Sequence, residues 1–293
     1  CVYIFNIHKF SLVFSKLYIY YEFLNFKLII IKYMKKLENK YLKIANECAE
    51  ASGKILKKYF RKKIKIERKS DNSPVTKADK EAEKIIRNII IKKAPECGFF
   101  GEESGKFNTS NEYVFVVDPL DGTKGFISGK PLFCTLIGLM KNNKPYIGVL
   151  NQPILNERWS GIANKEARYN NTKIRTTKCK RLKGLRMYAT SPMMFKGKNQ
   201  RVYKSVRSKI NECLFGLDSY SHGMLSAGFV DVVLEANLKP YDYIASAAVI
   251  SGAGGKLTDW NGDELNLESD GRILAAGDPK IHKQLLKVIQ KVK

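Results

Sequence analysis

Apolar residues recur along this chain with two different spacings, and each spacing predicts a different element. Between residues 40 and 60 the apolar side chains return every three or four positions, which predicts an amphipathic helix. A second helix is expected from Thr76 to about Lys93. Thr76 followed three residues later by Asp79 is the pattern of a capping box at its start.

Short apolar runs separated by polar turns predict strands in the first half of the chain. We expect them at 97–100, 113–117, 133–140, 145–150 and 157–162. Because the last four lie close together with short turns, they are expected to form an antiparallel sheet. After about residue 184 strands and helices alternate: strands 185–189, 230–234, 256–259 and 272–276, and helices 219–227, 242–252 and 278–292. The predicted fold class is a layered α+β domain, with halves at 34–170 and 171–293.

The first 33 residues differ from the rest, being mostly Phe, Tyr, Ile, Leu and Lys without turn signals. Charged residues interrupt this run, so it holds no stretch of about 18 uncharged apolar residues that would span a membrane. We expect residues 1–33 to be upstream DNA translated in frame, with Met34 as the true start. A genuine anchor or targeting segment is the alternative.

Composition narrows the function classes. Of the 293 residues 44% are hydrophobic, enough for a sizeable core, and the formal net charge is +24. The lysines are spread along the chain beside many Ile and Asn residues, as AT-rich codon usage would produce, so we expect no nucleic-acid partner and no membrane partner. The six cysteines show no paired spacing and are expected to be reduced thiols of a cytoplasmic protein.

The run Asp118-Pro119-Leu120-Asp121-Gly122-Thr123 carries the strongest chemical pattern. It follows the apolar run 113–117, so its two carboxylates are expected at the end of a buried strand. Carboxylates held so close repel each other unless a cation lies between them, and oxygen ligands suit Mg²⁺. Gly122 and Thr123 would begin a helix whose N–H groups can bind phosphate. Metal and phosphate on one turn indicate a phosphatase.

Three further acids stand beside glycine or proline at expected element ends: Asp79, Glu102 and Asp242. Taken singly, they have ordinary explanations, since Asp79 and Asp242 can cap helices and Glu102 can be a loop acid. In combination with the Asp118–Thr123 run, they form one ordered set of acidic motifs.

This set resembles the signatures of the inositol monophosphatase family, whose members are Mg²⁺-dependent, lithium-sensitive phosphatases. The matching features are Glu102-Glu103 in a glycine-flanked loop, the Asp118–Thr123 run, and Asp242 before a helix that ends in Gly254-Gly255. The resemblance covers about residues 40–290. It implies the family's αβαβα fold, two or three Mg²⁺ ions, a small phosphomonoester substrate and a homodimer.

The resemblance also implies roles for individual residues. The metal ligands would be Glu102, Asp118, the Leu120 carbonyl, Asp121 and Asp242. Glu102 and Thr123 would orient the attacking water, with Asp79 supporting Thr123. The substrate would contact Gly122, Thr123, Lys124, Asp218, Glu235 and Asp242.

Within the family the chain looks most like the histidinol-phosphatase branch of histidine biosynthesis. The segments that carry this likeness are 122–131, 152–159, 234–242 and 258–260. The chain departs from that branch at Asn151 and at 218–222, where it reads Asp-Ser-Tyr-Ser-His. The implied reaction is hydrolysis of L-histidinol phosphate. An inositol or sugar monophosphatase and a 3′-phosphoadenosine 5′-phosphate phosphatase are alternatives with the same metal chemistry, and a non-catalytic binding protein is the alternative of a different class.

Overall fold

The computed structural model describes residues 2–69, 74–178 and 181–292, with side chains from residue 26 onward. It contains two compact units, Cys1–Tyr41 and Leu42–Lys293. Helix α1, expected over 40–60, begins much earlier and has the bounds Val2–Tyr59. Within the part of the chain described, no helix is both long and apolar enough to cross a membrane.

The second unit contains an eight-stranded sheet in the order β10-β9-β8-β7-β6-β5-β3-β4. Its strands are β3 Gly98–Gly101, β4 Gly105–Phe107, β5 Tyr113–Asp121, β6 Cys134–Lys141, β7 Lys144–Gln152, β8 Glu157–Ile162, β9 Glu166–Tyr169 and β10 Thr172–Ile174. The predicted antiparallel pairing of β5, β6, β7 and β8 is confirmed. Of the other neighbouring pairs in this sheet, β3 and β5 run parallel and the rest are antiparallel. A connection that includes β4 joins these two strands.

A five-stranded sheet follows in the order β12-β11-β13-β15-β14. Its strands are β11 Arg186–Ala189, β12 Glu212–Phe215, β13 Val232–Glu235, β14 Lys256–Asp259 and β15 Ile273–Ala276. Strand β11 pairs in parallel with both β12 and β13, and the remaining pairs are antiparallel. The helices of this half are α4 Lys198–Arg207, α5 Tyr220–Ser226, α6 Pro240–Ala253 and α7 Pro279–Gln290, with a short 3₁₀ turn at Pro192–Met194.

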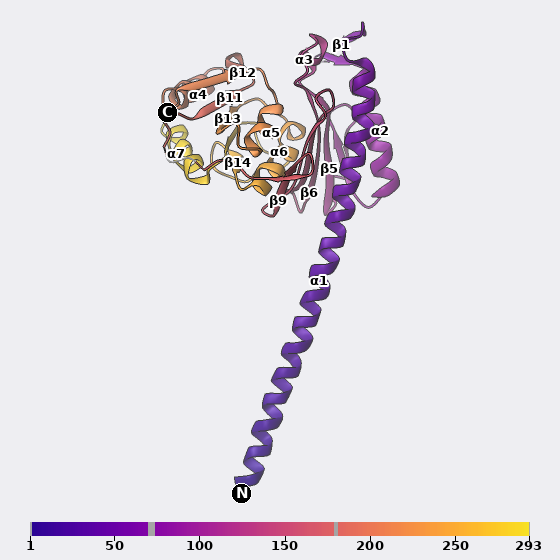
Figure 1. The fold of residues 1–293 in the computed structure, drawn as a ribbon, viewed down its shortest axis with the longest axis vertical. Helices are drawn as coiled ribbons and strands as arrows, with labels where there is room; N and C mark the ends of the chain where they lie inside the picture. Colours follow the sequence, from indigo (N-terminus) through magenta and orange to yellow (C-terminus); the bar gives the residue numbers. More distant parts are fainter. Residues whose placement is uncertain (1, 70–73, 179–180, 293) are drawn as a thin grey trace. The chain divides into compact units, whose positions relative to one another are not determined.

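The elements of this unit stack in five layers, as the ribbon in Figure 1 shows. The C-terminal part of α1 and helix α2, Lys77–Lys93, cover one face of the large sheet. Helices α5 and α6 lie between the two sheets, and α4 and α7 cover the outer face of the small sheet. The layered αβαβα arrangement predicted from the motifs is therefore confirmed.

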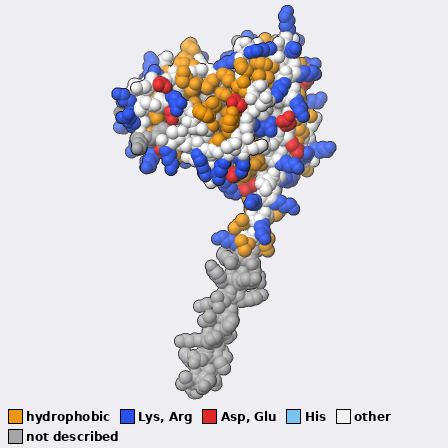
Figure 2. All heavy atoms as spheres, viewed as in Figure 1, with side chains coloured by type: hydrophobic (Ala, Val, Ile, Leu, Met, Phe, Trp, Pro, Cys, Tyr) orange, Lys and Arg blue, Asp and Glu red, His pale blue; other side chains and the backbone are white. Residues whose placement is uncertain are grey.

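Close backbone approach fixes α6 against the large sheet. A Cβ at Gly148 of β7 would lie 2.0 Å from the Ala245 carbonyl oxygen of α6, so only glycine fits there. The space-filling view in Figure 2 shows hydrophobic side chains gathered on the visible face and Lys and Arg side chains mostly around its edge.

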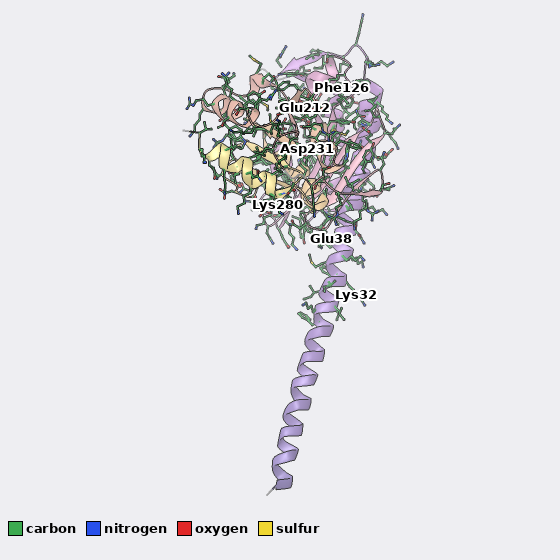
Figure 3. All side chains as sticks on the ribbon, turned by 60° about the vertical axis from the view of Figure 1, so that its left-hand side comes forward. Lys32, Glu38, Phe126, Glu212, Asp231 and Lys280 are labelled. Carbon is green, nitrogen blue, oxygen red and sulfur yellow. The ribbon has the colours of Figure 1, made fainter. Side chains whose placement is uncertain are left out.

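A two-stranded sheet of β1 Ile66–Arg68 and β2 Pro74–Thr76 leads into α2, and the short helix α3, Thr123–Ile127, follows β5. Phe126 of α3, labelled in Figure 3, is buried with its ring centroid 4.8 Å from that of Phe133. This contact anchors the five-residue helix to the core directly behind the acidic run.

Candidate active site

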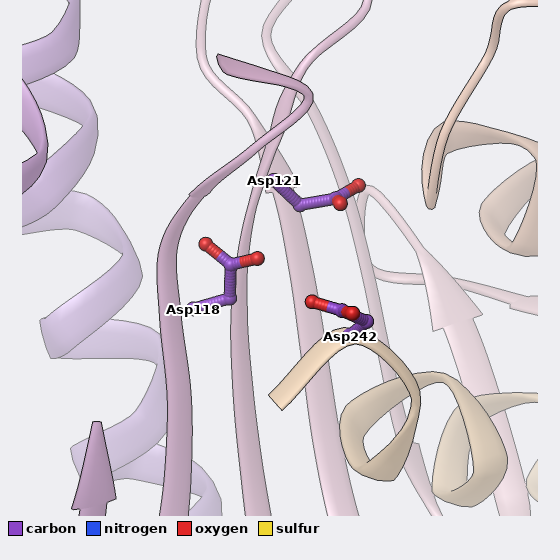
Figure 4. A group of neighbouring side chains, drawn as sticks. All are labelled: Asp118, Asp121 and Asp242. Atoms are coloured by element: carbon purple, nitrogen blue, oxygen red, sulfur yellow. The ribbon is translucent and has the colours of Figure 1, made fainter. Parts of the chain in front are cut away.

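Asp118 and Asp121 lie at the end of β5, and an irregularity in that strand turns them toward each other. In a regular strand, residues three apart point to opposite faces of the sheet. Here the pairing of β5 with β6 shifts register between Asp118 and Asp121. A shift of this kind re-aims side chains at the end of a strand. Figure 4 shows both carboxylates facing one common space.

Asp242 reaches the same space from the first turn of α6. Its Oδ2 accepts a hydrogen bond of 2.7 Å from the main-chain N–H of Lys239, which fixes the side chain at the start of the helix. One carboxylate oxygen from each of Asp118, Asp121 and Asp242 lies within 4.8 Å of the other two. We call these three residues the carboxylate cluster; Figure 4 shows it between β5 and α6.

The pKa values of all three acids in the carboxylate cluster are raised. Burial raises the pKa of Asp118 well above its ordinary value, and the neighbouring Glu102 and Asp121 raise it further. Burial also raises the pKa of Asp121, with Asp218 and Asp242 adding to the effect. For Asp242 burial and the charge of Glu102 bring the pKa to about 7, although the Lys239 N–H acts to lower it. All three acids hold their protons more tightly because they are buried and because other negative charges lie close by.

A divalent cation is the group that fits this arrangement. The donors are carboxylate oxygens converging on one space, which suits a hard ion such as Mg²⁺. A cation placed there would favour the ionised form of every acid and so reverse the raised pKa values. The geometry thus brings together three of the five ligands expected from the sequence, Asp118, Asp121 and Asp242.

Glu102 lies in the loop after β3, beside Asp118. Its main-chain N–H donates to the Val117 carbonyl at 3.1 Å, which ties the loop to β5. Lys69, which the sequence analysis did not single out, places its Nζ 2.7 Å from Oε1 of Glu102 and 2.7 Å from Oε1 of Glu103. Burial acts to lower the pKa of Lys69, but the two carboxylates outweigh it and raise that pKa. Lys69 therefore supplies positive charge at the edge of the cluster.

Asp79 and Thr123 meet behind the acidic run, as expected. The capping box is present: Oδ2 of Asp79 accepts from the Thr76 N–H at 2.8 Å, and the Thr76 hydroxyl accepts from the Ala78 N–H at 3.1 Å. The Thr123 hydroxyl lies 3.4 Å from Oδ1 of Asp79 and 3.0 Å from the Leu120 carbonyl oxygen. Burial raises the pKa of Asp79 to about 6. This contact links helix α2 to the hydroxyl at the start of α3.

Gly122 joins β5 to α3 in a conformation that favours glycine. Its φ is +86°, in the left-handed region, and it is the N-cap residue of α3. The first N–H groups of a helix have no partners within the helix. The N–H groups of Thr123 and Lys124, in the first turn of α3, therefore lack partners within the helix, and this turn directly follows Asp121 in the chain. The Lys124 side chain is exposed.

Asp218 and Glu235 approach the cluster from the small-sheet side. Asp218 lies close enough to Gly122 that a Cβ there would be 3.2 Å from Oδ2 of Asp218. Burial, with the charge of Glu235, raises the pKa of Asp218 to about 6, and Lys130 and Lys124 act in the opposite direction.

Glu235 is 2% exposed and has partners on both carboxylate oxygens. Oε1 accepts hydrogen bonds from the N–H and the hydroxyl of Thr190, and Oε2 lies 3.3 Å from Nε2 of His222. Nδ1 of His222 lies 2.9 Å from the Ser246 hydroxyl of α6. No motif in the sequence indicates that Thr190 donates hydrogen bonds to Glu235. Thr190 follows β11 and Glu235 ends β13, and these strands become neighbours only in the folded sheet.

Comparison with known proteins agrees with this geometry. A model described as the inositol monophosphatase family matches residues 37–293. A chloroplastic bifunctional phosphatase, IMPL2, of Arabidopsis thaliana is 42% identical over 261 residues, covering 86% of this chain and 75% of the relative. A histidinol-phosphatase of Chlorobaculum parvum is 29% identical over 242 residues, covering 80% of this chain and 91% of the relative.

A solved structure that is also similar in sequence has the same fold. It is an inositol monophosphatase from Zymomonas mobilis, 36% identical, with a TM-score of 0.79 over 86% of this chain and 98% of that chain. The family match, the relatives and the acidic site lead to one conclusion. This chain is a phosphatase-type hydrolase that belongs to the inositol monophosphatase family.

Proposed function

We propose that this protein hydrolyses L-histidinol phosphate to L-histidinol and phosphate in a Mg²⁺-dependent reaction. The observation that carries the chemistry is the carboxylate cluster, whose oxygens converge within 4.8 Å at the end of β5. In this account Glu102, Asp118, Asp121, Asp242 and the Leu120 carbonyl hold two or three Mg²⁺ ions. When bound, such ions neutralise phosphate charge and lower the pKa of a bound water.

The remaining roles fall to side chains and N–H groups of this chain. Glu102 and the Thr123 hydroxyl orient the attacking water, and Asp79 holds Thr123 from behind, at 3.4 Å. N–H groups at the start of α3 bind phosphate oxygens, because they lack partners within the helix. No covalent intermediate with the protein is required.

The acids on the small-sheet side favour a cationic leaving alcohol. Histidinol carries an ammonium group and an imidazole, both of which an acidic wall would attract. Asp218 is half-buried beside Gly122, and Glu235 lies close enough to raise its pKa. Similarity to the Chlorobaculum parvum histidinol-phosphatase supports the same substrate.

An inositol monophosphatase is the second candidate, since the Zymomonas mobilis structure covers 98% of its own length in the match. In that case Glu235 would accept hydrogen bonds from sugar hydroxyls. Glu235 is held by Thr190 and His222 and can interact with either leaving alcohol, whether it is cationic or carries hydroxyls. Substrate choice therefore depends more on Asp218 than on Glu235.

The test is phosphate release with Mg²⁺ from L-histidinol phosphate, inositol 1-phosphate and 3′-phosphoadenosine 5′-phosphate at equal concentrations. A kcat/KM for histidinol phosphate at least about tenfold above the others, equivalent to about 1.4 kcal/mol, supports the proposal. A preference for either other substrate would keep the metal chemistry and reject histidinol phosphate as the substrate.

A further inference from the structure

Helix α2 presents two buried acids toward the site, and only one of them has been given a role. Asp79 and Glu83 are four residues apart, so they lie on one face of the helix. Asp79 supports Thr123, as described above. Glu83 is 2% exposed, so its carboxylate is removed from water and needs polar partners inside the protein.

Those partners are main-chain groups of the loop that carries Glu102. Oε2 of Glu83 accepts from the Glu103 N–H at 2.8 Å, and Oε1 accepts from the Ser104 N–H at 2.7 Å. A carboxylate that accepts two N–H groups in this way fixes the path of both residues, because each bond is charge-assisted. Glu102 is the residue immediately before this pair.

Gly101, immediately before Glu102, shows how closely the Glu83 carboxylate fits. A Cβ at Gly101 would lie 2.6 Å from each carboxylate oxygen of Glu83, closer than atoms can approach. Glu83 therefore contacts the loop on both sides of Glu102, at Gly101 and at Glu103. Lys69 meanwhile contacts the side chains of Glu102 and Glu103, so the main chain and the side chains of the loop are held separately.

We propose that Glu83 is a positioning residue for metal binding: it does not touch the metal or substrate, but it holds the loop so that Glu102 faces Asp118. This inference rests on the proposed metal site. Losing the anchor would leave Glu102 free to move away from the cluster, which weakens metal binding while the acids on β5 and α6 stay in place.

The test is calorimetric titration of Mg²⁺ into the full chain and its variants, with thermal unfolding recorded in parallel. For Glu83→Ala we expect the Mg²⁺ dissociation constant to rise at least tenfold, and activity to recover partly at high Mg²⁺. Glu81→Ala is the matched control on the same helix, because Glu81 accepts from the Tyr59 hydroxyl of helix α1 instead of from the loop. It should bind Mg²⁺ as the wild type does.

A second variant keeps the test decisive if Glu83→Ala folds poorly. Gly101→Ala should displace the Glu83 carboxylate and weaken Mg²⁺ binding in the same direction. Since both changes act on one contact, the double variant should bind no more weakly than Glu83→Ala alone. Lower thermal stability with an unchanged Mg²⁺ dissociation constant in the folded variants would overturn the positioning role. Absence of Mg²⁺ binding in the wild type would overturn the metal site itself.

Discussion

The carboxylates at the end of the large sheet and the buried polar groups of the small sheet are in opposite electrostatic situations. Asp118, Asp121 and Asp242 face one another, and their pKa values are raised. In the small sheet, Glu235 is held by Thr190 and His222, and His282 lies 3.0 Å from the Thr258 hydroxyl. The carboxylate cluster needs a cation, whereas Glu235 and His282 have hydrogen-bond partners within the protein.

This difference separates two uses of buried polar groups. A cluster of buried acids that repel one another costs stability unless a cation binds there, so its presence favours a function. A buried acid that accepts hydrogen bonds from the protein, as Glu235 does from Thr190, keeps its position without a ligand. Changes in the first region should therefore alter metal-dependent activity, and changes in the second should alter stability or substrate choice.

The largest expected effect is on activity at the carboxylate cluster. Asp242→Asn should lower kcat/KM by about 1,000-fold, about 4 kcal/mol, because it removes a charged metal ligand from the site. The control is Asp263→Asn, an exposed acid outside the cluster, which should leave activity unchanged. Steady-state kinetics with saturating Mg²⁺ decides this, and equal activity of the two variants would remove Asp242 from the site.

Mg²⁺ should stabilise the fold through the same cluster. At a concentration one hundred times its dissociation constant, a ligand that binds only the folded state adds about 2.7 kcal/mol to the free energy of unfolding. In Asp118→Asn this gain should shrink, while the metal-free protein should be at least as stable as the wild type because one repelling charge is gone. Urea unfolding with and without Mg²⁺ measures both. An equal Mg²⁺ gain in wild type and variant would contradict the account.

The free energy of unfolding should depend on pH through His282, which packs beside the small sheet. Burial, with the charge of Lys256, lowers its pKa from the ordinary 6.5 to about 4. The unfolded state therefore binds more protons between pH 6.5 and 4, so stability is full above pH 6.5 and falls as the pH drops. The expected loss is about 2 kcal/mol between pH 8 and pH 5.

Replacing the histidine isolates this contribution. In His282→Gln the free energy of unfolding should depend less on pH, so its values at pH 8 and pH 5 should differ less than in the wild type. An unchanged slope would show that His282 does not titrate in this range on unfolding.

The smallest expected effect concerns substrate choice. Asp218→Asn should lower the preference for L-histidinol phosphate over inositol 1-phosphate by about tenfold, since one charge facing a cationic alcohol is lost. Glu212→Gln, a change at an exposed acid of β12, is the control. Competition between the two substrates measures the ratio directly, and a ratio unaltered by Asp218→Asn would exclude Asp218 from substrate recognition.

Local patterns in the sequence predicted the elements that depend on local chemistry. Strands 157–162 and 256–259 have the expected bounds, and the capping box at Thr76 forms as its spacing indicates. Helix α4, Lys198–Arg207, was not predicted, because Val202 and Val206 are its only buried residues in an otherwise polar segment. The parallel pairing of β3 with β5 was not predicted either, since hairpin-length turns indicate only antiparallel neighbours.

The candidate site likewise has features that local sequence patterns predicted and features that they did not. The acids of the 118–123 run could be placed from their position after an apolar run. The shift in register that turns Asp118 and Asp121 to one side depends on pairing with β6, which no local pattern encodes. The contacts of Lys69 and Glu83 with the Glu102 loop depend on how separate elements approach one another, so no spacing in the chain could reveal them.

The most direct test of the central claim is phosphate release from L-histidinol phosphate by the wild type and by Asp121→Asn, each measured with Mg²⁺ and with a chelator. We predict rapid release by the wild type with Mg²⁺, and almost none with the chelator or from Asp121→Asn. Release that continues undiminished with the chelator, or in Asp121→Asn, would contradict the assignment of the carboxylate cluster as the catalytic metal site.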